Sequence, residues 1–423
     1  MSKTEMPSIR FYGFDNDWEQ RKLSEITDKA TEKNAGLQYV ETFTNSAEFG
    51  IISQRDFFDH DIAKLGSLYG YYIVKNEDFV YNPRISTSAP VGPINRNKLG
   101  RTGVMSPLYT VFRPHDIDTT YLEYFFKCGY WHSFMNFNGD SGARSDRFSI
   151  RDNVFFQMPI PIPDIDEQRK IGELLTCLDN LITLHQRKFE KLTNVKKSML
   201  EKMFPQNGSS YPEIRFKGFT DPWEQRKFGE VFDCTVPNNT LSRAELSYDE
   251  GTVLNVHYGD VLIKYDSVLD VQKDDIPRIP HRCREDFNGA LLQDGDVIIA
   301  DTAEDETTGK ACEIGNLQGS AIVSGLHTMV CRPRNRMALG YLGYYLNSNA
   351  YHHQLLPLMQ GIKVLSLSRS NIQKTSVSYP SAMKEQQLIA SYFSQLDHLI
   401  TLHQRELEKL QNIKKSMLEK MFV

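Results

Sequence analysis

The chain carries the same long amphipathic segment twice. Residues 166–204 and 384–422 align without a gap and are identical at 25 of 39 positions. A second repeat precedes each copy, since residues 9–23 and 214–228 share ten of 15 positions. The long repeat is offset by 218 residues and the short one by 205, so the intervening segment is 13 residues longer in the second half. A period of this length indicates a duplicated domain, because solenoid repeats run about 20–50 residues.

Each copy of the long segment has the heptad pattern of a coiled coil. Apolar side chains recur every seven residues, with a second apolar position three residues later, over about four heptads. A helix of about 38 residues is about 57 Å long. Antiparallel pairing is favoured because each helix follows its own half of the chain. The residues expected at this interface, or against a partner, are Leu178, Leu181, His185, Leu192, Leu396, Leu399, His403 and Leu410.

Three further features of the helical segments carry expectations. His185 and His403 should meet or nearly meet in an antiparallel pair and fix its register; the alternative, a metal-binding or pH-sensing pair, lacks further ligands nearby. Asp164 with Glu167 predicts an N-terminal cap, and the proline-rich residues 159–163 predict a stiff extended spacer. The identity of the ends KKSMLEKMF, with the exposed Lys196, Lys197, Glu201 and Lys202 among them, favours a partner common to both copies.

The divergent middles read as mixed α/β with short strands. Segments rich in Val, Ile, Tyr and Phe lie between Gly, Pro or Asp residues, which is typical of strands. The predicted strands are residues 70–75, 79–81, 109–112, 260–264, 296–300 and 328–332. A short aromatic helix is expected after Pro114 and again after Pro333.

The formal net charge of −5 hides a basic stretch in each half. Residues 79–115 and 314–384 contain no acid, and local charge decides where a polyanion binds. Loops with glycine and basic residues lie at 141–153 and 360–371, where glycine permits close approach to a phosphate backbone. Arg and Lys neutralise phosphates, and Arg also reads guanine; solvated loops and structural turns remain the alternatives. The candidate DNA-binding residues are Arg84, Arg96, Lys98, Arg101, Arg144, Arg147, Arg332, Arg334, Lys363 and Arg369.

Cysteine usage and hydropathy indicate the cellular compartment in which the protein is found. The six cysteines form no CxxC pair, so neither a zinc site nor a disulfide framework is indicated. The sequence has no membrane-spanning apolar run and no signal-peptide pattern at its start. A cytoplasmic protein is therefore expected.

The order of these motifs resembles that of the specificity subunit of type I restriction–modification systems. The pattern P-x-[IL]-R-F-x-G-F is followed by W-E-x-x-K, a variable region, and a helix that starts with Glu-Gln and ends in KKxxLxKMF. All of it occurs twice, with the helices starting at Glu167-Gln168 and Glu385-Gln386. The resemblance covers essentially the whole chain, although the variable middles match only loosely.

The resemblance implies an α+β fold with pseudo-two-fold symmetry. Two α/β target recognition domains would be separated by two long conserved helices that form an antiparallel coiled coil. The implied segments are target recognition domain 1 (1–163), spacer helix 1 (164–204), a linker (205–211), target recognition domain 2 (212–381) and spacer helix 2 (382–423).

The resemblance also implies a function. Each recognition domain would read one half of a bipartite double-stranded DNA target, and the chain itself would be non-catalytic. Its partners would be two methyltransferase subunits and restriction subunits that act as translocase and endonuclease. No cofactor is expected on this chain; S-adenosylmethionine, ATP and Mg would bind to the partner subunits.

Three other functions are alternatives to DNA recognition. A self-contained DNA methyltransferase needs a glycine-rich cofactor loop and an Asp/Asn-Pro-Pro-aromatic motif, but the chain has no GxG and comes nearest at Asn82-Pro83-Arg84. A nuclease could use the acids between Asp301 and Glu306 with Lys310, provided that the carboxylates converge on metal ions. A non-DNA coiled-coil scaffold would not need paired basic stretches.

Overall fold

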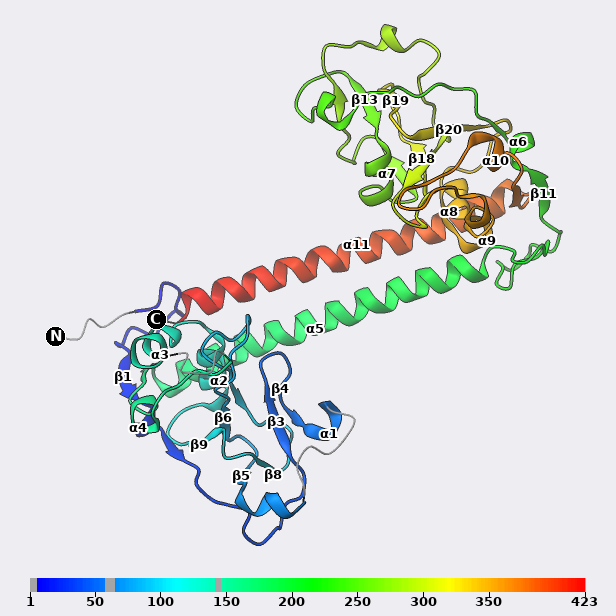
Figure 1. Cartoon of the computed structure of the whole chain (residues 1–423). Helices are drawn as coiled ribbons and strands as arrows, with labels where there is room; N and C mark the ends of the chain where they lie inside the picture. The colour runs from blue at the N-terminus through cyan, green and yellow to red at the C-terminus, as the bar shows by residue number, and fades with distance from the viewer. Residues whose placement is uncertain (1–5, 58–64, 141–145, 423) are drawn as a thin grey trace. The chain divides into compact units, whose positions relative to one another are not determined.

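The computed structural model describes residues 6–57, 65–140 and 146–422 (Figure 1). The chain divides into two compact units. Unit 1 comprises Met1–Gln186 with Arg405–Val423, and unit 2 comprises Arg187–Gln404. These units cut the chain differently from the predicted domains, because each unit takes in part of both long helices.

The two long helices, α5 (Ile165–Lys202) and α11 (Met383–Lys420), are antiparallel. In unit 1 the first half of α5 shares a hydrophobic core with Met421 and Phe422, which directly follow α11. In unit 2 the first half of α11 shares a core with Met203 and Phe204, which directly follow α5. The start of each helix therefore lies beside the end of the other. Over the residues that the structure describes, no helix combines the length and apolar character needed to cross a membrane.

Unit 1 is built on a four-stranded antiparallel sheet with the order β2-β9-β6-β7. Alternate residues of its central strand β6 face two different cores: Phe79 and Tyr81 pack with the aromatic side chains of α2, and Val80 packs with Phe43 on the other face. The elements of unit 1 outside the long helices are β1 (Glu19–Lys22), β2 (Thr27–Lys29), β3 (Phe43–Ser46), β4 (Gly50–Ser53), α1 (Gln54–Phe57), β5 (Tyr72–Val74), β6 (Phe79–Tyr81), β7 (Ile94–Arg96), β8 (Gly103–Met105), β9 (Thr110–Pro114), α2 (Thr119–Lys127), α3 (His132–Asn138), α4 (Asp152–Phe155) and β10 (Pro159–Ile162).

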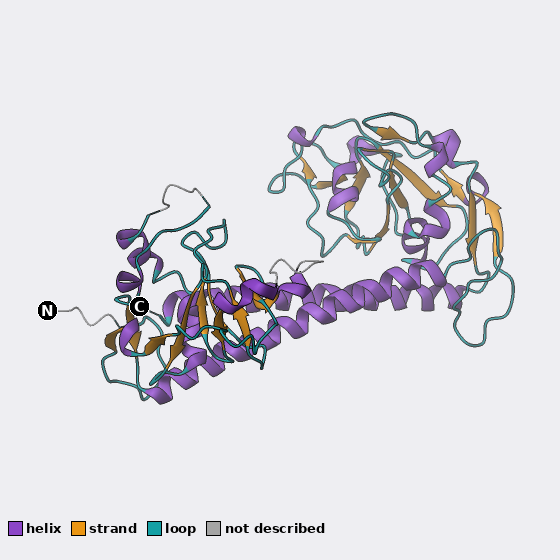
Figure 2. Cartoon of the chain, turned by 60° about the horizontal axis from the view of Figure 1, so that its bottom comes forward, coloured by secondary structure: helices purple, strands orange, loops and turns teal. Residues whose placement is uncertain are grey.

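Unit 2 repeats this plan with a five-stranded sheet of order β12-β20-β16-β18-β14. Its central strand β16 shows the same alternation, with Val297 and Ile299 in one core and Ile298 and Ala300 in the other. Figure 2 shows these strands in orange and the helices in purple. The elements are β11 (Glu224–Lys227), α6 (Phe228–Val231), β12 (Phe232–Asp233), β13 (Val253–Val256), α7 (Tyr258–Ile263), β14 (Val268–Asp270), β15 (Arg278–Ile279), β16 (Val297–Ala300), β17 (Thr302–Ala303), β18 (Ala311–Gly315), β19 (Ala321–Ser324), β20 (Thr328–Pro333), α8 (Tyr341–Asn347), α9 (Asn349–His352), β21 (Leu365–Ser366), α10 (Arg369–Ile372) and β22 (Ser376–Tyr379).

The predicted strand at residues 260–264 is wrong, because this segment belongs to helix α7. Val261 of this helix is buried in the same core as Tyr265, which lies two residues beyond the end of α7. His257 precedes the helix and accepts a hydrogen bond from the backbone of Gly259. The Val, Ile and Tyr content that suggested a strand serves a helix here.

Each long helix begins on the short repeated motif of its own half. Arg10 donates two hydrogen bonds to the carboxylate of Glu167, at 2.8 and 2.9 Å. Arg215 binds Glu385 in the same way, at 2.7 and 2.9 Å. Both glutamates are buried. Asp164 directly precedes α5, the position predicted for the cap, whereas both carboxylate oxygens of Glu167 bind Arg10.

The glutamine after each of these glutamates joins the helix to the sheet domain. The Gln168 side chain accepts a hydrogen bond from the backbone of Asp118 at 2.9 Å and donates one to the carbonyl of Pro163 at 2.8 Å. Gln386 makes the equivalent bonds with Ala338 and Pro380, both at 2.9 Å. The repeated Glu-Gln pair thus fixes how each helix leaves its domain.

The proline-rich lead-in to α5 is a strand and not a spacer. β10 pairs antiparallel with β1, with Pro161 opposite Gln20. The hydroxyl of Tyr121 donates to the carbonyl of Pro161 at 2.6 Å. Proline is tolerated because this is a two-stranded sheet, where each strand has an edge.

The constant ends of the helices pack inside the units. Phe422 contacts Tyr121 with ring centroids 5.4 Å apart, and Phe204 contacts Tyr345 at 5.5 Å. Lys414 forms an ion pair with Asp179 in unit 1, and its repeat counterpart Lys196 pairs with Asp397 in unit 2. Internal packing therefore explains much of the identity that had suggested a common partner, while Lys197 and Glu201 remain exposed.

In each unit the sheet packs against a short aromatic helix, α2 in unit 1 and α8 in unit 2. The acid that stabilises this contact comes from the helix in unit 1 and from the sheet in unit 2. In unit 1, Arg96 on β7 pairs with Glu123 on α2 at 2.6 Å, and Lys98 and Lys127 also bind that carboxylate. In unit 2 the strand β18 supplies the acid: Glu313 accepts a hydrogen bond from the backbone of Gly343 at 2.9 Å. Because cations surround it, the pKa of Glu123 is held at about 2 against the effect of burial.

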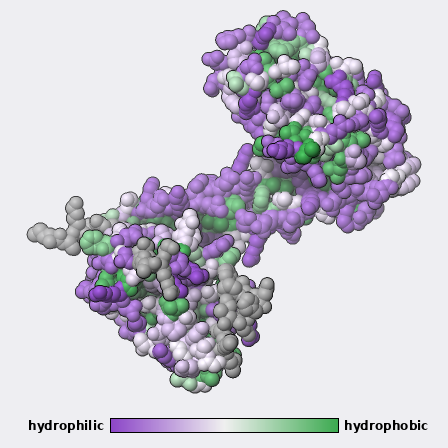
Figure 3. Space-filling model, viewed as in Figure 1, coloured by the Kyte–Doolittle hydropathy of each residue, from purple (hydrophilic) through white to green (hydrophobic). Residues whose placement is uncertain are grey.

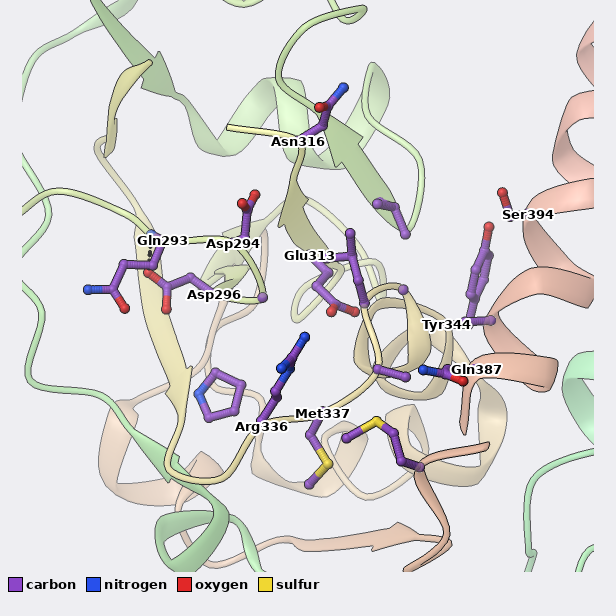
Figure 4. A pocket seen from close by; sticks show the side chains of 18 of the residues that line it. Gln293, Asp294, Asp296, Glu313, Asn316, Arg336, Met337, Tyr344, Gln387 and Ser394 are labelled. Atoms are coloured by element: carbon purple, nitrogen blue, oxygen red, sulfur yellow. Dashed lines mark hydrogen bonds between the residues drawn. The ribbon is translucent and has the colours of Figure 1, made fainter. Parts of the chain in front are cut away.

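Glu313 lines a cavity of about 1230 Å³ in unit 2. Figure 4 shows its carboxyl group and the guanidinium of Arg336 pointing into this space, with Tyr344, Asp294 and Asp296 around it. Burial raises the pKa of Glu313 to about 7, although backbone amides of α8 oppose the shift. Glu313 is therefore a buried acid with a strongly perturbed protonation equilibrium.

Replacing Arg215 with Met is expected to destabilise unit 2 by roughly 3 kcal/mol, because it leaves the buried carboxylate of Glu385 without its cation. Arg226→Met is the matched control, since its pair with Glu224 is exposed and should contribute less than about 1 kcal/mol. Urea unfolding of the full chain measures both. Equal losses in the two variants would contradict the anchoring role of Arg215.

Stability should also depend on pH through Glu313. Below its ordinary pKa of 4.5 the carboxyl is neutral in both states; between 4.5 and about 7 the unfolded chain loses the proton and the folded chain keeps it. The free energy of unfolding should therefore fall as pH rises across this window, by roughly 3 kcal/mol. Urea unfolding at pH 5 and pH 8 should show this slope in the wild type and in Glu304→Gln, an exposed control, and lose it in Glu313→Gln. The same slope in all three would refute the assignment.

Candidate nucleic-acid interface

Both units place a pair of loops at the carboxyl end of their central strand. In unit 1, Phe148 donates its backbone N–H to the carbonyl of Pro83 at 2.8 Å. In unit 2, Leu367 donates to the carbonyl of Asp301, also at 2.8 Å. The segment after β6 or β16 thus pairs with one of the two glycine-containing basic loops. The structure brings together, in each unit, two segments more than 60 residues apart in sequence.

These hydrogen bonds align the two units residue by residue. Arg84 faces Arg147 in an antiparallel bridge, and Thr302 faces Ser366 in the β17–β21 pair. Tyr109 directly precedes β9 and His327 directly precedes β20, but the strand registers make Leu108, and not Tyr109, the counterpart of His327. The frame is the same in both units, but the side chains that it presents differ.

In unit 1 the loop pair borders a hollow of about 370 Å³. Arg84 is 68% exposed and lies 3.8 Å from Asp146. The hydroxyl of Tyr109 lies 3.4 Å from that of Thr44. The side chains that line the hollow include Asn82, Arg84, Tyr109 and Arg147, which together offer amide, guanidinium and phenol groups for hydrogen bonds.

In unit 2 the corresponding edge carries hydroxyl, imidazole and aromatic groups. The hydroxyl of Thr302 donates to Asp301 at 2.8 Å, and the Nδ1 atom of His327 lies 3.5 Å from the same carboxylate. Tyr258 contacts His327 edge-on, with ring centroids 5.3 Å apart. Burial lowers the pKa of the neighbouring His257, which favours its neutral form. This edge is therefore less basic than that of unit 1.

Four of the ten candidate DNA-binding residues are bound to carboxylates at the opposite end of the sheet or beside it. The side chain of Arg96 is 9% exposed and pairs with Glu123. Arg332 forms a two-point pair with the buried Asp296, as Arg113 does with Asp78 in unit 1. Lys98 binds Glu123 and Arg101 binds Glu41, although both basic side chains are about half exposed. The basic residues of the acid-free stretches are therefore paired with acidic residues from segments that are distant in sequence.

The remaining candidates divide by position. Arg84 and Arg147 lie on the loop pair of unit 1, and Lys363 and Arg369 belong to the segment that pairs with β17 in unit 2. Arg334 is exposed but follows the far end of β20. Arg144 lies outside the described residues. Sequence reasoning missed Tyr109, Asn82, Thr302 and His327; aligning the halves on the Arg-Pro that ends β9 and β20 brings only Tyr109 and His327 to neighbouring positions.

Some of the residues predicted at the helix interface are buried, and others are exposed. Leu178 and Leu396 are buried, and Leu192 and Leu410 pack against the cores. Leu181 and Leu399 are 38% and 40% exposed, whereas Leu175 on the first helix is buried and Ile182 is half-buried. His185 in unit 1 and His403 in unit 2 are half-buried, and their meeting remains a prediction.

No part of the interface suggests a metal centre. Within residues 6–57, 65–140 and 146–422, no three His, Cys, Asp or Glu side chains gather in a way that could hold a metal ion. The acidic residues near Asp301 form hydrogen bonds with residues close to them in sequence. Asp305, for example, accepts a hydrogen bond from the backbone of Thr307 at 2.9 Å. The surface seen in Figure 3 is mainly hydrophilic, with small hydrophobic groups between.

Comparison with known proteins finds relatives that are specificity subunits of type I restriction enzymes. The type I restriction enzyme MjaVIII specificity subunit of Methanocaldococcus jannaschii is 22% identical over 275 residues, which are 63% of this chain and 61% of that protein. The putative type I restriction enzyme MjaX specificity subunit of the same organism is 23% identical over 283 residues, 64% of this chain and 60% of that protein. Each alignment thus spans less than two thirds of the relative's length.

A solved structure shares the fold. The crystal structure of a type I restriction–modification system S subunit from M. genitalium has a TM-score of 0.53 and 13% sequence identity, and the match covers 99% of each chain. The predicted fold class, two α/β domains with two long antiparallel helices, is confirmed. A family model described as the type I restriction modification DNA specificity domain matches residues 15–194 and 220–412. Because these two matches span most of the chain, the protein belongs to the type I restriction–modification DNA specificity family and carries its domain twice.

Proposed function

We propose that this chain is the DNA sequence-recognition subunit of a type I restriction–modification complex, and that each unit reads one half of a bipartite double-stranded target. The observation that carries the proposal is the pair of equivalent loop edges. Arg84 and Thr302 hold the same place in the same backbone frame, as do Arg147 and Ser366. A shared frame with different hydrogen-bonding groups is what two different half-sites require.

The side chains suit direct reading of bases. Arginine can donate two hydrogen bonds to guanine in the major groove, and Arg84 and Arg147 stand together on one loop pair. Thr302 and Ser366 offer hydroxyls that bond to several base edges, and Lys363 adds a cation for phosphates. Hence unit 1 would favour a guanine-containing half-site, whereas unit 2 would rely more on neutral contacts.

The chain would act without chemistry of its own. Catalysis would belong to partners: two methyltransferase subunits that bind S-adenosylmethionine, and restriction subunits that use ATP and Mg as translocase and endonuclease. Such a complex works on cellular DNA, so a cytoplasmic location is proposed. Family membership supports this arrangement.

The competing functions lack a supporting observation. In the place where a methyltransferase would need its catalytic motif, the Asn82 amide donates to the backbone of Asn45 at 2.8 Å and holds the loop. In the candidate nuclease segment, Asp301 and Asp305 bind the neighbouring threonines. A coiled-coil scaffold does not require two matched loop edges.

A methylation map is the first test. The full chain, expressed with its cognate methyltransferase subunit in a host without adenine methylation, should produce a split motif methylated once on each strand. Sequencing for modified adenine reads out both half-sites together. A complex that assembles and binds S-adenosylmethionine but leaves the DNA unmodified would refute the proposal.

Arg84→Gln should weaken binding to the mapped target about tenfold or more and relax the base preference in one half-site only, because it removes about 1–3 kcal/mol of discrimination. Arg101→Gln is the matched control: it lies in the same acid-free stretch, but its guanidinium is held by Glu41. Titration of variant half-sites at fixed salt distinguishes the two, since phosphate contacts change affinity uniformly. Equal effects of the two substitutions would place the reading edge elsewhere.

A further inference from the structure

Unit 2 contains two buried thiols that face each other across neighbouring strands. β12 pairs with β20 with Asp233 opposite Arg332, so the next residues along, Cys234 and Cys331, are also opposite each other. Their Sγ atoms are 3.5 Å apart, and the residues are only 4% and 1% exposed. This separation exceeds a disulfide bond by about 1.5 Å. Directly opposite residues of antiparallel strands have Cα atoms about 4.5–5.5 Å apart, which is within the range that a disulfide spans.

The same place in unit 1 holds a different pair. There Lys29 on β2 stands opposite Phe112 on β9. Lys29 forms an ion pair with Asp152, the first residue of α4. The register of the strands makes Cys234 the counterpart of Lys29 and Cys331 that of Phe112.

The first residue of the following short helix reverses its charge between the units. Asp152 begins α4 in unit 1, whereas Arg369 begins α10 in unit 2. In unit 1 an acid faces a cation; in unit 2 a cation faces a thiol, which can become an anion. The exchange of both partners preserves attraction only if Cys234 carries negative charge.

The electrostatic surroundings agree with this arrangement. A hydrogen bond with Cys331 lowers the pKa of Cys234 against the opposing effect of burial, and the positive charge of Arg369 lowers it further. By contrast, burial raises the pKa of Cys128 and of Cys312 to about 12. Hydrogen bonds with Glu285 and Asp286 raise the pKa of Cys283.

We propose that Cys234 and Cys331 form a modification site that hydrogen peroxide oxidises to a disulfide. The Cys234 thiolate attacks one peroxide oxygen, the O–O bond breaks, and with one proton the first water leaves, giving a sulfenic acid. The Cys331 sulfur then attacks the sulfenic sulfur, its own proton and the hydroxyl leave as the second water, and the S–S bond forms. Two thiols lose two electrons in total, and the peroxide gains them.

The test treats the full chain with hydrogen peroxide and follows all cysteines by mass spectrometry. Remaining thiols are blocked in denaturant, and the protein is digested without reduction. The expected product is one linked peptide pair that contains Cys234 and Cys331 and is two hydrogens lighter than its reduced parts. In Cys331→Ala the link should be lost, and dimedone should trap the sulfenic acid on Cys234. Cys331→Ser serves the same purpose should the alanine variant not fold.

A charge variant checks the role of Arg369. Arg369→Gln should slow formation of the link about five- to tenfold at pH 7, because less thiolate is present. Arg336→Gln removes an exposed arginine elsewhere in unit 2 and should leave the rate unchanged. If Cys234 and Cys331 stay reduced after the exposed Cys177 and Cys283 are fully oxidised, the proposal fails. Pairing of Cys234 with another cysteine would overturn it equally. The readout needs no DNA and is therefore independent of the proposed function.

Discussion

The pairing of an arginine from each short repeat with the first glutamate of each long helix is the contact on which the rest of the architecture depends. Arg10 reaches Glu167 across 157 residues, and Arg215 reaches Glu385 across 170. A two-point pair fixes orientation as well as distance, because both guanidinium donors must meet both carboxylate oxygens. Each helix therefore leaves its sheet domain in one direction, and the adjacent glutamine locks it to the backbone.

A second consequence follows from where the helices end. Phe422 completes the core of unit 1 and Phe204 completes that of unit 2. The core of each sheet domain therefore includes residues from the end of the long helix that follows the other sheet domain. The repeated sequence KKSMLEKMF is constrained by this exchange, since its lysine binds an aspartate and its phenylalanine fills an aromatic core. Constancy at the helix ends leaves the loops at the sheet edge free to diverge.

The sequence was sufficient for the features that rest on periodicity and repetition. Two long helices, two α/β middles and the antiparallel order all follow from heptads and from one duplicated plan. Local composition was a poorer guide where tertiary contacts decide. Arg96 and Arg332 looked like free cations because no acid stands near them in sequence, yet Glu123 and Asp296 reach them from other segments. Likewise, the Val and Ile of α7 suggested a strand because periodicity over so few residues cannot separate the two structures.

The candidate interface was only half accessible to sequence reasoning for the same physical reason. The glycine-containing loops could be located, but their pairing with the segments after β6 and β16 is a matter of backbone hydrogen bonds formed across more than 60 residues. Only that pairing makes Arg84 the counterpart of Thr302, whereas the registers of β2 with β9 and of β12 with β20 make Lys29 the counterpart of Cys234. Comparing the two halves in three dimensions therefore separates two kinds of change. Loop-edge positions such as the exposed Arg84 and the half-buried Thr302 carry different hydrogen-bonding groups, as expected of surfaces that bind different ligands. Interacting positions, such as Lys29 with Asp152 and Cys234 with Arg369, change together, so that in each unit the cation faces a group that can carry the opposite charge.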